Sequence, residues 1–181
     1  MVRRIRERSS VPIALMTYYN PVFHFGEKAF VQQAKAAGVD GVIIPDLPVE
    51  EASVLRRHAV KAGLATVFFV APTTDAGRLK PVVRAATGFI YYVSVAGVTG
   101  VRKAVAAEIA AGVRRVKALT SKPVCVGFGV STPGQAKAIA RVADGVIVGS
   151  AIVKEVHRHE GHRDLVPRVG AFTARLVKAV K

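Results

Sequence analysis

Six apolar runs, each followed by a segment with helical spacing, constrain this chain more than any other feature of its sequence. Near-continuous apolar strands separated by helices indicate a parallel sheet that is covered by helices. Residues 2–8 are predicted to be the end of a helix, because no capping residue precedes them. The predicted strands are 12–18, 41–47, 65–71, 88–95, 123–129 and 145–149, and the predicted helices are 26–37, 49–61, 75–86, 103–119, 132–142 and 165–180.

This alternation fits two α/β architectures. We expect a TIM (β/α)8 barrel that lacks its first two βα units, so that residues 1–181 form a single partial barrel domain with six parallel strands. A doubly wound open sheet is the alternative. Such a sheet usually has one ligand site at a central switch point, whereas loops of functional character follow almost every strand here, which favours the barrel.

Two glycine-rich turns stand at the ends of the last two predicted strands, at 126–132 and 146–150. Glycines at such a position let the backbone approach a ligand closely. The N–H groups of the turn and of the following helix N-terminus can then receive an anion. Two such turns in adjacent βα units predict one phosphate-binding pocket, and therefore a phosphorylated small molecule as the ligand.

The chain is strongly basic, with 27 Lys and Arg against 12 Asp and Glu and a net charge of +15. This charge favours anionic partners, so a nucleic-acid-binding function has to be weighed. The basic residues are dispersed over the outer faces of predicted helices, without the interleaved aromatic residues of a single-strand-binding face. We therefore expect a solvated basic surface and no nucleic-acid partner.

The single cysteine, Cys125, lies inside a predicted strand, so no disulfide can form within the chain and a reducing compartment fits. We expect Cys125 to be part of the core. The basic start of the chain is not followed by an apolar run long enough for a signal peptide, and no run reaches the length of a membrane span. The expected location is the cytoplasm, with no membrane association.

Six short motifs follow one another along the chain: Pro-Ile-Ala-Leu-Met-Thr-Tyr-Tyr-Asn-Pro-Val at 12–22, Pro-Asp-Leu-Pro-Val-Glu-Glu at 45–51, Tyr-Tyr-Val-Ser at 91–94, Gly-Val-Thr-Gly at 97–100, Gly-Phe-Gly at 127–129 and Gly-Ser-Ala-Ile-Val at 149–153. Taken together, they resemble the motifs of the tryptophan synthase alpha subunit, from residue 2 to about 156. The resemblance implies a lyase of tryptophan biosynthesis that cleaves indole-3-glycerol phosphate to indole and glyceraldehyde 3-phosphate by a retro-aldol reaction.

The resemblance also implies a partner, the tryptophan synthase beta subunit, in an alpha2beta2 heterotetramer. Pyridoxal phosphate would belong to that beta partner, so no cofactor is expected in this chain. Carried over by position, the backbone amides of Gly100, Gly129, Gly149 and Ser150 would bind the substrate phosphate, with Gly127 and Phe128 shaping the pocket. Met16, Tyr18, Ile43 and Tyr91 would line the indole end, and Thr99 would help to close a mobile loop over the substrate.

The reaction needs a carboxylate base and a second carboxylate at the indole nitrogen. In the family, both lie in the second βα unit, which would precede Met1, so we predict no catalytic residue within residues 1–181. Asp46 follows a strand and could face the pocket, but its position resembles a subunit-contact edge. Glu50 and Glu51 stand where carboxylates are favoured at the start of a helix.

Three histidines near the C-terminus, His157, His159 and His162, could suggest a metal site. With this spacing in a charged segment, the three imidazole groups do not readily come together on one metal ion, and no cysteine lies nearby. We therefore expect a solvated loop and no metal. Two alternatives to the lyase stay open. One is a non-catalytic remnant that binds phosphate or docks on a partner. The other is a different phosphosugar-binding barrel, such as an isomerase or epimerase, which the tyrosine and Gly-Val-Thr-Gly motifs disfavour.

Overall fold

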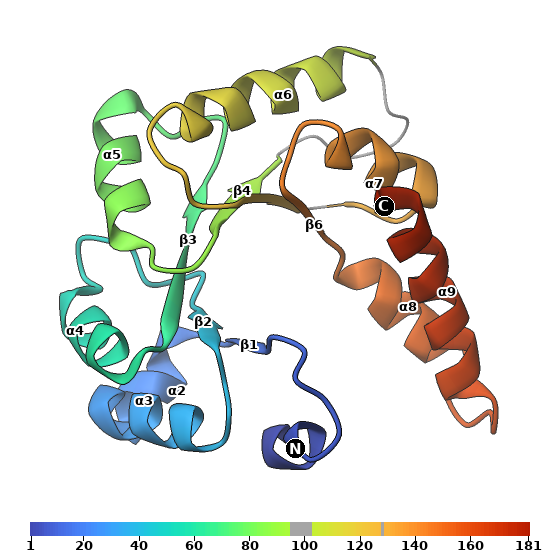
Figure 1. The fold of residues 1–181 in the computed structure, drawn as a ribbon, viewed down its shortest axis with the longest axis horizontal. Helices are drawn as coiled ribbons and strands as arrows, with labels where there is room; N and C mark the ends of the chain where they lie inside the picture. Colours follow the sequence, from blue (N-terminus) through green and yellow to red (C-terminus); the bar gives the residue numbers. More distant parts are fainter. Residues whose placement is uncertain (95–102, 128) are drawn as a thin grey trace. The chain divides into compact units, whose positions relative to one another are not determined.

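The computed structural model describes residues 1–94, 103–127 and 129–181, and strands alternate with helices along these residues, as predicted (Figure 1). The strands are β1 Ala14–Met16, β2 Gly41–Ile43, β3 Ala65–Val70, β4 Ile90–Val93, β5 Val124–Gly127 and β6 Gly145–Ile147. The helices are α1 Val2–Arg6, α2 Tyr19–Phe25, α3 Glu27–Ala36, α4 Ser53–Ala62, α5 Ala76–Ala85, α6 Lys103–Lys117, α7 Pro133–Ala140, α8 Ser150–Arg158 and α9 Leu165–Val180.

The chain divides into two compact units. The first unit comprises Met1–Val70 and Thr74–Ile90, and the second comprises Ala71–Thr73 and Tyr91–Lys181. In each unit, strands that follow one another in sequence are neighbours in the sheet, in the order β1-β2-β3 in the first and β4-β5-β6 in the second. The pairs β1–β2, β2–β3 and β5–β6 are parallel, which confirms the α/β class.

The core of the first unit is built around β2, whose three residues are all buried. Helices α3 and α4 pack on each other, and α4 and α5 pack on β3. Val31, Leu55 and Leu79, one from each of these helices, are at most 2% exposed. Burial of a side chain of this size stabilises a fold by about 1.5–3 kcal/mol relative to its exposure, so these contacts hold the helices on the sheet.

The tetrapeptide Asp-Gly-Val-Ile occurs twice, beginning at Asp40 and at Asp144, and it starts β2 and β6. Each aspartate accepts a hydrogen bond from the backbone amide at the start of the preceding strand. The amide of Ile13 donates to Asp40 Oδ2 at 2.8 Å, and the amide of Val124 donates to Asp144 Oδ2 at 2.9 Å. Because the bond joins two neighbouring strands at their amino ends, it helps to fix their relative register.

A basic side chain completes each of these contacts. Arg6 pairs with Asp40, and Lys117 Nζ lies 2.6 Å from Asp144 Oδ1. The amide of Ile13, helped by Arg6, holds the pKa of Asp40 below its ordinary value. The hydrogen bond from Lys117, followed by that from the Val124 amide, lowers the pKa of Asp144 in the same way. Both carboxyls are therefore held in the ionised form.

Helix α2 is a correction, because the sequence predicts no helix between the strand 12–18 and the helix 26–37. The amide of Tyr19, its first residue, donates to Asp46 Oδ1 at 2.8 Å. A carboxylate at a helix N-terminus satisfies an amide that lacks a partner within the helix and favours the helix dipole. Because this acceptor lies 27 residues away in sequence, the local pattern around Tyr19 does not reveal it.

Helix α8 corrects a second prediction, because no helix is expected from the sequence between 149 and 165. His157 and Arg158 form its last turn, and the chain from His159 to His162 turns into α9, so the predicted solvated loop is wrong for its first part. Both α7 and α8 pack on α9. Among the described residues, no helix is both long enough and apolar enough to cross a membrane.

Candidate functional site

The predicted site residues fall in both units, and each unit is described by itself. The first unit holds Met16, Tyr18, Ile43 and the acidic Asp46. The second unit holds Tyr91, Gly127, Gly129, Gly149 and Ser150. Thr99, Gly100 and Phe128 lie outside the described residues.

In the second unit, helix α8 begins with an open N-terminus. Its N-cap is Gly149, no side chain of the described residues caps it, and its first turn carries no acidic residue. The amides of Ile152 and Val153 donate to the Gly149 carbonyl at 2.9 and 3.2 Å. Ser150 and Ala151 therefore carry the first amides at the positive end of the helix dipole. Gly149 and Ser150 are exposed, so an anion can reach these donors from solvent.

Helix α7, after the first glycine turn, has a closed N-terminus instead. Thr132 Oγ1 accepts from the amide of Gln135 at 3.3 Å. Gln135 Oε1 accepts in return from the amides of Ser131 and Thr132, at 2.8 and 3.1 Å. This reciprocal arrangement is a capping box, which satisfies amides at the start of α7 from within the chain. The helices after the two glycine turns thus begin differently, with amides capped in α7 and uncapped in α8, whereas the sequence suggests a matched pair.

The strand that leads into the first glycine turn is tightly fixed at Gly127. A Cβ atom on Gly127 would come within 2.8 Å of Tyr91 Cζ and 3.0 Å of Ile147 Cβ, so only glycine fits below the Tyr91 ring. Tyr91 is half-buried, and burial raises the pKa of its hydroxyl. Tyr91 therefore packs directly behind the turn that the sequence assigns to phosphate binding.

Gly129 lies at the outer edge of the same turn, exposed to solvent. Its φ of +72° is in the left-handed region, where a side chain would be strained. The structure thus supplies a physical reason for a glycine at Gly129, and its exposure leaves the backbone there open to a ligand.

Two residues that hold this turn are absent from the sequence-based prediction. Ser94, directly after β4, is 3% exposed and binds the carbonyl of Gly127. Its partner is 33 residues away, so no local pattern could have indicated it. Gln135 could have been found, because Thr132-x-x-Gln135 ahead of an apolar run is the sequence pattern of a capping box.

In the first unit, two of the three residues expected at the indole end have accessible side chains. Met16 is 63% exposed and Tyr18 is 68% exposed, at and just after the end of β1. Ile43 is 9% exposed and belongs to the buried strand β2. Of these three residues, Met16 and Tyr18 therefore offer accessible apolar surface, and Ile43 offers very little.

The acidic residues of the first unit have structural partners. Asp46 is exposed and accepts the hydrogen bond from the Tyr19 amide. Glu50 forms a two-pronged ion pair with Arg78, at 3.2 and 3.1 Å, rather than starting a helix. The backbone amide of Glu50 and the Arg78 guanidinium lower the pKa of this carboxyl. The lowered pKa of Glu50 does not suit a general base, whose pKa has to lie near the working pH.

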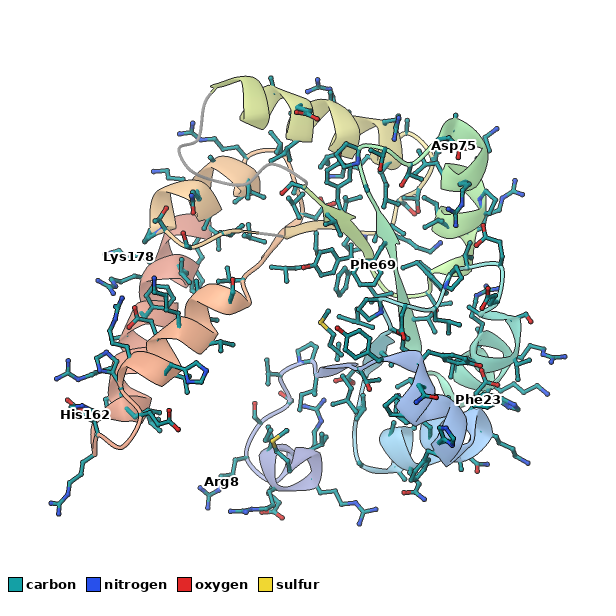
Figure 2. All side chains as sticks on the ribbon, turned by 180° about the vertical axis from the view of Figure 1, so that it is seen from behind. Arg8, Phe23, Phe69, Asp75, His162 and Lys178 are labelled. Atoms are coloured by element: carbon teal, nitrogen blue, oxygen red, sulfur yellow. The ribbon has the colours of Figure 1, made fainter. Side chains whose placement is uncertain are left out.

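The histidines near the C-terminus pair with glutamates. His157 Nδ1 lies 3.6 Å from Glu160 Oε2, and His159 Nε2 lies 3.5 Å from Glu155 Oε2. His162 lies in the turn between α8 and α9 (Figure 2). No group of three His, Cys, Asp or Glu side chains in the described part of the chain could hold a metal ion. Cys125, expected in the core, is a half-buried free thiol whose pKa is raised by burial.

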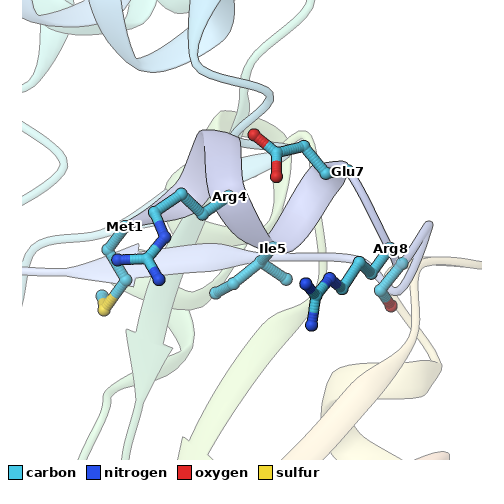
Figure 3. A pocket seen from close by; sticks show the side chains of 6 residues that line it. Met1, Arg4, Ile5, Glu7 and Arg8 are labelled. Atoms are coloured by element: carbon cyan, nitrogen blue, oxygen red, sulfur yellow. The ribbon is translucent and has the colours of Figure 1, made fainter.

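A separate open hollow lies on the surface beside α1. Met1, Arg4, Ile5, Glu7, Arg8 and Ser9 line it (Figure 3). It contains none of the residues that the sequence assigns to substrate, and the helix that forms it has five residues. We assign it no ligand.

Comparison with known proteins gives a consistent result. The family model for the tryptophan synthase alpha chain matches residues 1–181. The tryptophan synthase alpha chains of Citrifermentans bemidjiense and Geobacter sulfurreducens are 47% and 48% identical over 180 residues, which are 99% of this chain and 67% and 68% of theirs. The chain thus spans about two thirds of the length of these relatives.

Solved structures agree. Tryptophan synthase subunit alpha from Legionella pneumophila superposes with a TM-score of 0.89 at 38% identity, over 99% of this chain and 66% of that one. A chain from the tryptophan synthase a2b2 complex of Pyrococcus furiosus gives 0.87 at 39% identity, over 98% and 71%. These matches confirm the resemblance seen in the motifs: the chain belongs to the tryptophan synthase alpha chain family, a family of lyases.

Proposed function

We propose that this chain binds the phosphate of indole-3-glycerol phosphate at the N-terminus of α8, as part of the cleavage of that substrate to indole and glyceraldehyde 3-phosphate. The observation that carries the proposal is the open helix N-terminus at Gly149 and Ser150, which has no side-chain cap and no acidic residue in its first turn. Such a terminus attracts a phosphate both through its amides and through the helix dipole. Membership of the tryptophan synthase alpha chain family supports the choice of substrate.

The turn after β5 contributes the second part of the proposed phosphate site. Gly129 presents an exposed backbone in a left-handed conformation, and Gly127 supports it from the buried side. Gly100, Thr99 and Phe128 belong to the proposed site by resemblance alone, as does the pocket-lining role of Met16, Tyr18 and Ile43. Tyr91, which packs on Gly127 in the same unit, would face the indole end.

The cleavage breaks the carbon–carbon bond between the indole ring and the glycerol phosphate. A hydroxyl of the departing chain loses a proton as it becomes an aldehyde, and the indole carbon gains one, so a carboxylate that moves protons is required. The carboxylate of Asp46 is engaged by the Tyr19 amide, which argues against a role as this base. We propose that the catalytic carboxylates of the family lie outside residues 1–181, within the barrel plan of eight βα units to which these six strands correspond.

The exposed aromatic surface of α2 is the docking surface that we propose for a tryptophan synthase beta chain. Phe23 and Phe25, both on α2, are 62% and 52% exposed. Large exposed aromatic residues are enriched at protein–protein interfaces. The Pyrococcus furiosus relative belongs to an a2b2 complex, which supports this partner. A cytoplasmic setting, where the Cys125 thiol stays reduced, fits the same assembly.

A turnover assay tests the proposal. The polypeptide of residues 1–181, mixed with a tryptophan synthase beta chain, should bind indole-3-glycerol phosphate in a calorimetric titration but release no indole above a buffer blank. General acid–base catalysis contributes about 10²–10⁴-fold, so its absence is measurable. Absence of binding would remove the proposed substrate. Robust indole release that Asp46→Asn abolishes would show that Asp46 is the base.

A further inference from the structure

We propose that Ser94 and Gln135 are positioning residues for phosphate binding, which hold the turn after β5 at its two ends without touching the phosphate. The inference rests on the proposed function of this turn. It concerns how the chain keeps the backbone at Gly129 in the shape that a ligand needs.

Ser94 fixes the end at which the chain enters the turn. Its backbone amide donates to the carbonyl of Gly127 at 3.1 Å, and its hydroxyl donates to the same oxygen at 3.3 Å. Both residues are buried, and Tyr91 covers Gly127 from the side on which a Cβ would project. Two donors on one oxygen fix the direction of the Gly127 carbonyl, because a carbonyl has two lone-pair directions to satisfy.

Gln135 fixes the end at which the chain leaves the turn. Its Oε1 accepts from three groups, the amide of Ser131, the hydroxyl of Ser131 and the amide of Thr132, at 2.8, 3.1 and 3.1 Å. These bonds direct the amides of Ser131 and Thr132 into the cap of α7. The donors left for a ligand on this side of the site are then those nearer to Gly129.

Gly129 lies between the two anchored ends and holds a left-handed conformation with φ of +72°. Glycine populates many other conformations when it is not held, so a turn that contains it loses conformational freedom when it binds a ligand. Anchors at both ends remove that freedom in advance, and affinity improves because the ordering cost is not taken from the binding energy. Ser94 and Gln135 thus act on the ligand through the backbone.

Calorimetric titration of the 181-residue chain with glycerol phosphate tests the positioning role of Ser94 and Gln135. Ser94→Ala and Gln135→Met, which remove one hydroxyl and one acceptor, should each weaken binding about threefold to tenfold. Ser94→Cys keeps the size of the side chain and weakens the donor, and it serves if Ser94→Ala does not fold. The amide resonance of Gly129 should also move in these variants before any ligand is added, which a general loss of stability does not cause.

Two matched controls remove comparable hydroxyls elsewhere. Thr66 Oγ1 donates to the Ala85 carbonyl in the first unit at 3.5 Å, and Thr173 Oγ1 donates to the Val169 carbonyl in α9 at 2.9 Å. Thr66→Val and Thr173→Val should lower Tm yet leave the affinity and the Gly129 resonance unchanged. If the wild type binds and Ser94→Ala and Gln135→Met bind equally well, the positioning role is wrong and the proposed function stands. If the wild type does not bind glycerol phosphate, the proposed function fails, and this inference fails with it.

Discussion

Strands β2 and β6 start alike and end differently. Both open with Asp-Gly-Val-Ile, and the aspartate of each accepts from the backbone amide of the preceding strand and from a basic side chain. After β2, the chain reaches Asp46, whose carboxylate occupies the N-terminus of α2. After β6, it reaches Gly149, which leaves the N-terminus of α8 uncapped.

This difference shows that the two ends of a strand have different roles. The aspartate at the amino end helps to set the register, and it makes the same kind of hydrogen bond in both units. The residues at the carboxyl end determine what can bind: the amide at the start of α2 already has a carboxylate, whereas the first amides of α8 face solvent. An anion can therefore approach the helix N-terminus after β6, whereas the carboxylate after β2 already occupies the first amide of α2.

The largest expected effect comes from making the end of β6 resemble the end of β2. Gly149→Asp places a carboxylate at the N-cap of α8, where φ is −115° and, among the described residues other than the two chain neighbours, no atom lies within 4 Å of the position that a Cβ would take. The carboxylate should accept from the helix amides and repel phosphate, so that affinity for glycerol phosphate falls by at least about 100-fold. The free chain should gain at most a few tenths of a kcal/mol, because φ −115° and ψ −86° at Gly149 differ from the extended backbone in which an Asp side chain caps a helix best.

Calorimetric titration and thermal unfolding measure the two effects of Gly149→Asp together. Gly170→Asp is the matched control, since Gly170 is exposed on α9 and also has open space around it. It should leave the affinity within about twofold of the wild type while adding the same charge. Wild-type affinity in Gly149→Asp would mean that the N-terminus of α8 does not bind phosphate.

A smaller effect is expected on the free energy of unfolding, when the capped helix α7 is compared with the uncapped helix α8. Thr132→Ala removes the side-chain cap of α7 and should cost about 1 kcal/mol of unfolding free energy. Ser150→Ala should change it by less than about 0.5 kcal/mol, because no side chain caps α8. Denaturant unfolding of the two variants makes the comparison, and equal losses would show that α7 and α8 begin in the same way.

The smallest effect concerns the shared start of the two strands. The pKa of Asp144 is lowered in the folded chain, so its contribution to stability is present above its ordinary pKa and is lost as the pH falls through the folded value. Its side chain is 36% exposed, so solvent screening keeps the contribution below about 1 kcal/mol. In thermal unfolding between about pH 5 and pH 2, the Tm should therefore fall less steeply in Asp144→Asn than in the wild type. Parallel curves would show that Asp144 adds nothing through its charge.

The alternation of strands and helices could be predicted from the sequence because buried parallel strands are continuous apolar runs. The predicted strand 12–18 is too long, since β1 contains only Ala14–Met16. Its pairing with β2 covers those three residues. Just outside the paired residues, the Thr17 amide still donates to the Ile43 carbonyl, and the Ile13 carbonyl accepts from the Gly41 amide.

The site is predictable only in part. Glycine after a strand indicates where the backbone must be close to a ligand, and Gly127 and Gly129 both have a structural reason to be glycine. Whether the first amides of the following helix can receive an anion depends on how its N-terminus is capped. The cap of α7 is local and readable as Thr132-x-x-Gln135, whereas the contact between Asp46 and Tyr19 joins residues far apart in sequence. Helix α8 is absent from the prediction even though it carries the proposed donors.

Backbone amide resonances during a phosphate titration test the central claim most directly. Glycerol phosphate added to the ¹⁵N-labelled chain should shift the amides of Gly149, Ser150 and Ala151 strongly, because they lie at the open N-terminus of α8. The amides of Ser131 and Thr132, which donate to Gln135, should move far less. Largest shifts at Ser131 and Thr132, or no saturable shift at Ser150, would contradict the assignment of the phosphate to α8.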